Sequence, residues 1–114
     1  MLFIFEARIK PGHSVKEYVD AWNNGSSIIQ KEPGAKGTKL HRKTGEKGVL
    51  LAIAEWESKA ARDQAMTHLK EVDSKTREIL DKHATIADIT VIGNFEDSEW
   101  HVSPEGQYTP PEIK

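Results

Sequence analysis

Two segments of the sequence, residues 2–10 and 49–56, are apolar on both faces of the strand that each of them predicts. Leu2-Phe3-Ile4-Phe5 and Val49-Leu50-Leu51-Ala52 place apolar side chains at odd and even positions alike. Successive side chains of a strand point to opposite faces of its sheet, so both faces of these two strands need a cover. We therefore expect them to be the central strands of a sheet that is packed on both sides.

Amphipathic helices are predicted after the first and third strands. Ser14 and Glu17 fit a capping box, and Glu32-Pro33-Gly34 carries the stop signals that end the first helix. Ser58 is the expected N-cap of a second helix, and Asp73 is that of a further helical piece. The apolar residues of the first helix recur at helical spacing, and they are Val15, Tyr18, Val19, Trp22 and Ile29.

The remaining strands are predicted at residues 36–43 and 85–95, with a turn that contains two glycines at residues 44–48. The resulting order, β-α-β-β-α-β, matches a ferredoxin-like α+β sandwich, in which helices cover one face of a four-stranded antiparallel sheet. The other face stays open in this fold, although the central strands are apolar there. A second copy of the chain is the simplest cover, so we expect a homodimer.

The predicted ferredoxin-like domain spans residues 1–96, and residues 97–114 are expected to form an extended C-terminal arm. The prolines and ring-bearing residues of this arm are Pro104, Pro110, Pro111, Trp100, His101 and Tyr108. The rings are expected either to anchor the arm on a partner subunit, or to cap the mouth of a pocket, or to belong to a disordered end.

Composition limits the partners of the chain. Its 114 residues include 16 basic and 18 acidic ones, which gives a net charge of -2. This charge excludes a generally basic surface for binding nucleic acid and a strong electrostatic attraction to an acidic membrane. The sequence has no cysteine and no apolar run near the roughly 18 residues that a membrane span needs. Residues 1–6 lack the basic leader of a secretory signal, so we expect a cytoplasmic protein with no nucleic-acid or membrane partner.

Several kinds of site find no support in the motifs. The five histidines lack metal-ligand spacing, so no metal site is predicted. The sequence contains no GxGxxG, GxxxxGK[ST] or GxSxG motif. It therefore gives no support to a glycine-rich loop that binds nucleotide phosphates, or to a serine hydrolase with a nucleophile elbow. Arg62, Glu57 and Asp63 are expected to form surface pairs near the start of the second helix.

One histidine and two tryptophans are the candidate ligand-binding residues. His68 lies on the predicted apolar stripe of the second helix, where it could deprotonate a phenolic substrate, or simply pack against a backbone carbonyl. Trp22 and Trp56, together with small residues such as Ser26, can frame a slot for a flat ligand. The alternative is that the small residues permit close packing while the two tryptophans fill the core.

Three short runs of the sequence resemble a known family. Ala54-Glu55-Trp56-Glu57-Ser58, Lys10-Pro11-Gly12 and Glu32-Pro33-Gly34 are similar to runs at matching places in antibiotic biosynthesis monooxygenase-like domains. The resemblance covers roughly residues 2–95 as an order of elements. It implies a dimeric α+β barrel that holds its substrate between helices and sheet. Some members oxygenate quinol- or anthrone-type aromatics without a cofactor.

The haem-degrading branch of that family resembles the chain in layout only. Its characteristic Asn and Trp would fall at Ala7 and Ala65, and its ligand His near Lys75, between His68 and His83. These departures argue against haem degradation and leave haem binding through one of the two histidines open.

The leading hypothesis is therefore a homodimeric oxygenase of a small quinol- or anthrone-type aromatic, acting without metal, flavin or other cofactor. In it His68 is the base, and Phe5, Trp22, Ser26 and Trp56 contact the ligand. The alternative is a non-catalytic dimer that binds a small ligand or has a structural role, with haem binding as a third hypothesis. In a purely structural dimer, the layer around Trp22 and Trp56 would be fully packed, with no cavity.

Overall fold

The computed structural model describes residues 1–106. Its elements are β1 (Leu2–Ile9), α1 (Val15–Ile29), β2 (Ala35–Arg42), β3 (Val49–Trp56), α2 (Lys59–Leu69), α3 (Ser74–Ile86) and β4 (Ala87–Phe95). The four strands form one antiparallel sheet in the order β2-β3-β1-β4. This arrangement confirms the predicted ferredoxin-like α+β fold and the central position of β1 and β3.

Each helix begins at the cap that the sequence predicts. The Ser14 hydroxyl accepts a hydrogen bond from the Glu17 amide at 3.1 Å, and the Glu17 carboxylate accepts one from the Ser14 amide at 3.3 Å. Ser58 caps α2 in the same way, and Asp73 caps α3. These side chains satisfy backbone N–H groups that have no partner inside the helix, so the helix starts are determined locally.

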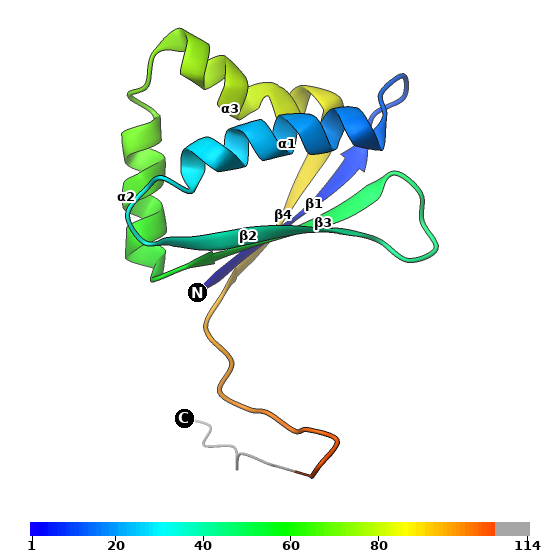
Figure 1. Ribbon diagram of the computed structural model, residues 1–114, viewed down its shortest axis with the longest axis vertical. Coiled ribbons are helices and arrows are strands. Elements are labelled where there is room, and N and C mark those ends of the chain that lie inside the picture. The colour runs from blue at the N-terminus through cyan, green and yellow to red at the C-terminus, as the bar shows by residue number, and fades with distance from the viewer. Residues whose placement is uncertain (107–114) are drawn as a thin grey trace.

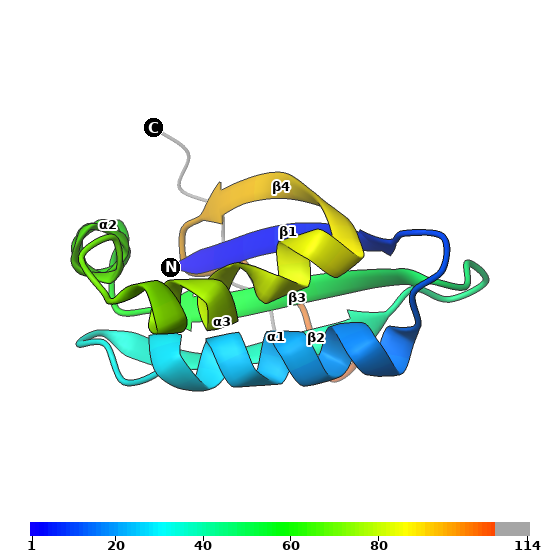
Figure 2. The same ribbon diagram turned by 90° about the horizontal axis from the view of Figure 1, so that it is seen from above.

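The helices α1 and α3 lie side by side over one face of the sheet, while α2 runs across the end of the sheet (Figure 1, Figure 2). The side of α1 that is buried is centred on Tyr18, Ala21 and Gly25. Gly25 lies against α3, because a Cβ atom placed on it would be 3.6 Å from the Ile79 carbonyl oxygen. Val19 was predicted on the same stripe but is 37% exposed, since it lies beside this narrow contact.

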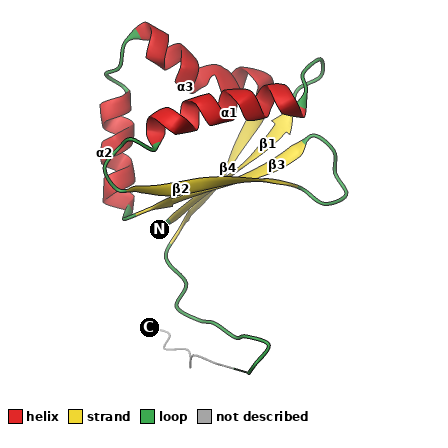
Figure 3. Cartoon of the chain, viewed as in Figure 1, coloured by secondary structure: helices red, strands yellow, loops and turns green. Residues whose placement is uncertain are grey.

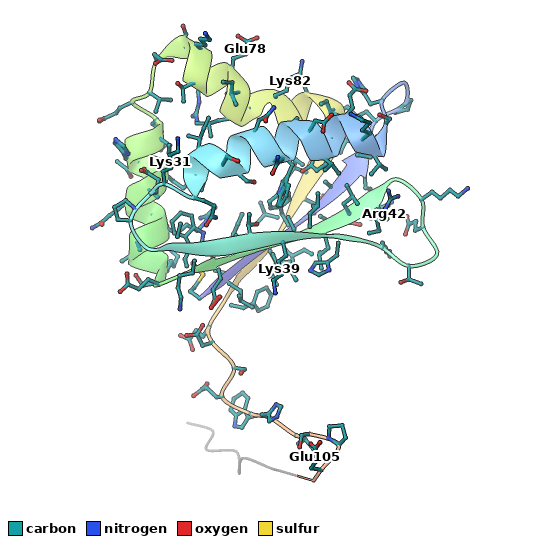
Figure 4. The ribbon with its side chains drawn as sticks, in the orientation of Figure 1. Lys31, Lys39, Arg42, Glu78, Lys82 and Glu105 are labelled. Carbon is teal, nitrogen blue, oxygen red and sulfur yellow. The ribbon has the colours of Figure 1, made fainter. Side chains whose placement is uncertain are left out.

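The main buried cluster lies between this helical layer and the sheet. Its residues come from β1, α1, β3, α3 and β4, and they are Ala7, Tyr18, Ala21, Leu50, Ile86 and Ala87. Charged side chains lie outside it; those of Glu78 and Lys82 on α3 are exposed at the outer surface of the helical layer (Figure 4). The core therefore positions α1 and α3 firmly over the central strands.

The opposite face of the sheet carries apolar side chains as well. Ile4 pairs with Ile53 in the register of β1 and β3, and Leu2 and Leu51 occupy the same face of these strands. No helix of residues 1–106 covers this face, as Figure 3 shows with its helices in red on one side of the yellow strands.

The described part of the predicted arm, up to residue 106, leads away from the sheet (Figure 1). The amino group of Met1 lies 2.8 Å from the Asp97 carboxylate, close to where the arm begins. Trp100 is 49% exposed. Tyr108, Pro110 and Pro111, which the sequence also assigns to the arm, lie outside the described residues. Within residues 1–106, no helix is long and apolar enough to cross a membrane.

Candidate active site

A cavity of about 270 Å³ lies between the helices and the sheet. This volume is near the lower end of the range for small-molecule sites. Most of the cavity wall is apolar, and the polar side chains in it are Ser26, Gln30, Thr38, Arg62 and His83. None of the described residues that line the cavity is an aspartate or a glutamate. The site therefore suits a small ligand with a large apolar surface.

Four of the five residues proposed from the sequence meet at this cavity. Phe5 of β1, Trp22 and Ser26 of α1, and Trp56 of β3 all line it. Trp56 is 2% exposed, so most of its ring packs inside the protein and only part of it contributes to the wall. The sequence therefore anticipated that these side chains share one layer, although their contact with a ligand stays a prediction.

His68 does not line the cavity. Its side chain is 68% exposed, and its Nδ1 atom lies 2.6 Å from the Glu32 carboxylate. This hydrogen bond raises the pKa of His68, which favours the charged imidazolium. The prediction that His68 faces inward is wrong because α2 turns a different side toward the cavity. At 100° per residue, His68 lies about 160° around the helix from Met66, which does line the cavity.

The histidine at the cavity is His83 of α3. Its Nδ1 atom lies 3.0 Å from the hydroxyl oxygen of Tyr18, and its ring lies 5.9 Å from that of Phe5, between centroids. Burial lowers the pKa of His83, so the imidazole is neutral at neutral pH. The periodicity of α3 could have revealed this histidine, since His83 lies three residues after the buried Leu80 and three before the buried Ile86.

Tyr18 determines how His83 can act. The phenol is fully buried, and burial raises its pKa well above its ordinary value, so it keeps its proton. When the hydroxyl donates to Nδ1, the Nε2 atom of His83 carries a hydrogen and is a donor. When Nδ1 carries the hydrogen and donates to the hydroxyl oxygen, Nε2 is an acceptor. The pair can therefore supply either a donor or a base at the cavity wall.

Arg62 is the second cavity residue that sequence reasoning missed. The surface pairing expected for it does not occur within residues 1–106; instead, its guanidinium carbon lies 3.7 Å from the centroid of the Phe3 ring. Burial lowers the pKa of this guanidinium from its ordinary high value. The spacing of Arg62 and Met66 on α2 was the available signal, because residues four apart share one face of a helix.

Two of the polar lining groups are already engaged with the backbone. The side-chain oxygen of Gln30 accepts a hydrogen bond from the Gly37 amide at 2.9 Å, and the Thr38 hydroxyl donates to the Ile53 carbonyl at 3.3 Å. Arg62 and His83 therefore carry most of the polar chemistry that the cavity wall can offer. Residues 1–106 contain no group of three or more His, Cys, Asp or Glu side chains that could hold a metal ion.

Comparison with solved structures places the fold among known proteins. SnoaB of Streptomyces nogalater, described as a cofactor-independent oxygenase, is 11% identical, with 86% of this chain and 95% of that chain covered at a TM-score of 0.63. A putative antibiotic biosynthesis monooxygenase of Bordetella bronchiseptica is 12% identical, with coverages of 85% and 96% and a TM-score of 0.65. A conserved protein of Methanosarcina mazei Go1 is 16% identical, with coverages of 82% and 91% and a TM-score of 0.60. At these identities, the likeness establishes the fold alone.

The sequence itself carries the family assignment. No curated protein has a significant match to the chain. Residues 1–71, however, match the family described as antibiotic biosynthesis monooxygenase, and this match spans more than half of the 114 residues. It includes β1, α1, β2, β3 and α2, and thus the strands and helices that supply most of the cavity wall. The chain therefore belongs to the antibiotic biosynthesis monooxygenase family.

Proposed function

We propose that this chain oxygenates a small quinol- or anthrone-type aromatic in the cavity without a bound cofactor. The observation that carries the proposal is an apolar cavity with one neutral histidine, His83, held by the buried Tyr18. The fold shared with SnoaB supports the same class of reaction. The base, which sequence reasoning sought in His68, is His83 in this proposal.

The substrate must be able to reduce O₂ itself once it has lost a proton. His83, with Nε2 unprotonated, accepts that proton from the methylene group of the anthrone or from its enol hydroxyl. The resulting anion gives one electron to O₂, and the two radicals combine into a carbon-bound peroxide, which takes the proton back from His83. Loss of water then leaves a carbonyl group. The methylene carbon supplies all four electrons, so no other reductant is needed.

The rest of the cavity wall holds the substrate and excludes water. Phe5 and Trp22 offer flat apolar contacts to an aromatic ring, and Ser26 offers a hydroxyl beside them. An apolar wall of this kind keeps water away from the substrate anion and protects the peroxide from side reactions.

The test is the uptake of O₂ with anthrone as substrate, with formation of anthraquinone followed by absorbance. We expect uptake above the buffer background for the unaltered protein, its loss in His83→Ala, and its retention in the matched control His68→Ala, since His68 lies outside the cavity. Full activity in His83→Ala would remove His83 from the mechanism. A protein that binds anthrone but consumes no O₂, with anthrone or with a panel of quinols, would favour the non-catalytic ligand-binding hypothesis.

We further propose that the chain is a homodimer joined through the open face of the sheet. Leu2, Ile4, Leu51 and Ile53 support this, because they place apolar side chains at the centre of that face of the two central strands, with Glu6 and Glu55 opposite Leu51 and Leu2. A second copy, placed sheet to sheet, would remove this surface from water and close a barrel. Residues of the arm would then be available to contact the partner subunit.

A further inference from the structure

The position of Arg62 in the cavity wall indicates what kind of ligand the cavity takes. Arg62 is the one permanently charged side chain among the described residues that line the cavity. Within residues 1–106 its guanidinium group forms no ion pair and no hydrogen bond. The neighbouring Asp63 carboxylate favours the charged guanidinium through its charge alone, and it lies 2.7 Å from the Lys59 ammonium. A partly buried cation with no hydrogen-bonded anion is incompletely compensated, and a bound anion would supply the missing contact.

The contact with Phe3 leaves the hydrogen-bond donors of Arg62 available. The guanidinium carbon lies 3.7 Å from the ring centroid, which is a cation–π contact. The described residues accept no hydrogen bond from the N–H groups of this guanidinium, so these groups remain available to a ligand. A planar fork of donors is the geometry that binds a carboxylate with two parallel hydrogen bonds.

Arg62 and His83 lie at two different places along the cavity. Arg62 contacts Phe3, whereas the His83 ring lies 5.9 Å from the ring of Phe5. The rings of Phe3 and Phe5 are neighbours on β1, with centroids 6.0 Å apart. The two phenylalanines therefore form an apolar floor with a cation toward one end and a neutral imidazole toward the other.

We propose that the cavity selects an aromatic acid: a flat ligand whose carboxylate pairs with Arg62 and whose phenolic or enolic oxygen lies at His83. The His83 part of this assignment rests on the proposed function, whereas the Arg62 part rests on the cavity alone. The absence of carboxylate side chains among the described lining residues fits the same ligand, because an acid in the wall would repel it.

The test compares two ligands of nearly the same shape, one charged and one neutral. The probes are 6-hydroxy-2-naphthoate and 6-hydroxy-2-naphthamide, which carry the acid or the amide at the far end of the rings from the hydroxyl group. Neither is an anthrone, so their affinities can be measured by isothermal titration calorimetry without oxygen chemistry. We expect the unaltered protein to bind the carboxylate at least about tenfold more tightly than the amide, as one charged hydrogen-bonded pair provides.

The variants separate Arg62 from general charge effects. Arg62→Met keeps a long apolar stem over Phe3 and should bind both probes equally, and Arg62→Lys should keep part of the preference. The control Lys70→Met removes the same charge at the exposed C-cap of the same helix, so it should keep the full preference. Circular dichroism and urea unfolding of each variant establish that it is folded.

The outcomes distinguish this inference from the proposed function. Equal affinity for the two probes, binding of neither, or a preference that survives in Arg62→Met would overturn the assignment of Arg62, whatever the oxygen uptake with anthrone. A clear carboxylate preference in a protein that consumes no O₂ with anthrone or with quinols, whether or not these carry a carboxylate, would support the anionic ligand and refute the oxygenase.

Discussion

The hydroxyl of Tyr18 and the Nδ1 atom of His83 lie 3.0 Å apart, and they join α1 to α3 beneath the cavity. Within the described residues this is the one hydrogen bond made by the Tyr18 side chain. The residue proposed as the base is thus held by a residue of the buried core. A change in this pair is therefore expected to alter both the stability of the fold and the proposed reaction.

Replacing Tyr18 by phenylalanine should therefore affect both the stability of the protein and its oxygen uptake. The ring would still fill the core, but Nδ1 of His83 would lose its partner in a partly buried place. We expect a loss of about 1 kcal/mol in the free energy of unfolding, measured by urea denaturation. Oxygen uptake should fall while anthrone binding changes little, because the Nδ1–H group of His83 would lose the oxygen that accepts its hydrogen bond when Nε2 is the base. A variant as active as the unaltered protein would show that the pair is only structural.

The pKa values of His68 on α2 and His83 on α3 should lie on opposite sides of the ordinary value of 6.5. Burial lowers the pKa of His83, whereas the Glu32 carboxylate raises that of His68. Proton NMR of the imidazole signals, assigned with His83→Gln and His68→Gln, measures both. Equal pKa values for the two would contradict the burial of His83.

These pKa shifts also determine whether the stability of the fold rises or falls with pH. Because the unfolded chain binds a proton at position 83 more readily than the folded one, His83 destabilises the fold as the pH falls below 6.5. His68 acts in the other sense: its stabilising effect is present below pH 6.5 and is lost as the pH rises through its raised pKa. His83→Gln should therefore flatten the loss of stability on the acid side. Oxygen uptake should also fall on that side, since a protonated His83 cannot accept the substrate proton.

The turn between α1 and β2 offers a test of packing against α2. Gly34 has φ of +88°, and a Cβ atom on it would lie 2.6 Å from the Cβ atom of Ala61. Gly34→Ala should destabilise the protein by more than the roughly 1 kcal/mol that left-handed backbone costs an ordinary residue. Gly45→Ala is the matched control, because Gly45 has φ of +78° with nothing within 4 Å of the added atom. Equal losses in urea denaturation would show that the contact with Ala61 relaxes freely.

The apolar open face of the sheet predicts how the dimer can be broken. Ile53→Glu places a charge at the centre of that face, beside Ile4, and should give a monomer by light scattering coupled to size-exclusion chromatography. Lys82→Glu is the control, since Lys82 is exposed at the outer surface of the helical layer, away from this face. A monomer for the unaltered protein would refute the homodimer itself.

The sequence was sufficient to predict those features of the fold that depend on neighbouring residues alone. The caps Ser14, Ser58 and Asp73 determine where helices start, and the two-sided apolar pattern of β1 and β3 determines that they are central. Trp22 and Trp56 were predicted in one layer because alternation and helical spacing fix the face that each residue occupies.

The sequence was insufficient where the angle between elements decides the outcome. An apolar stripe on α2 predicts that one side is buried, but the position of α2 across the end of the sheet determines which residues reach the cavity. His68 thus points to solvent, while Arg62, which local charge patterns assign to the surface, lies on Phe3. The role of His83 depends on the approach of α3 to Tyr18, a contact between residues 65 positions apart.

The main buried cluster contains no residue of α2, although α2 supplies Arg62 and Met66 to the cavity wall. The cavity-lining residues of α2 therefore lie apart from that cluster, while Ala65 and Leu69 of the same helix are buried and hold it in place. Substitutions of Arg62 or Met66 can alter which molecules are accepted without changing the residues of the main cluster. A scaffold divided in this way allows related chains to diverge in substrate while they keep one architecture.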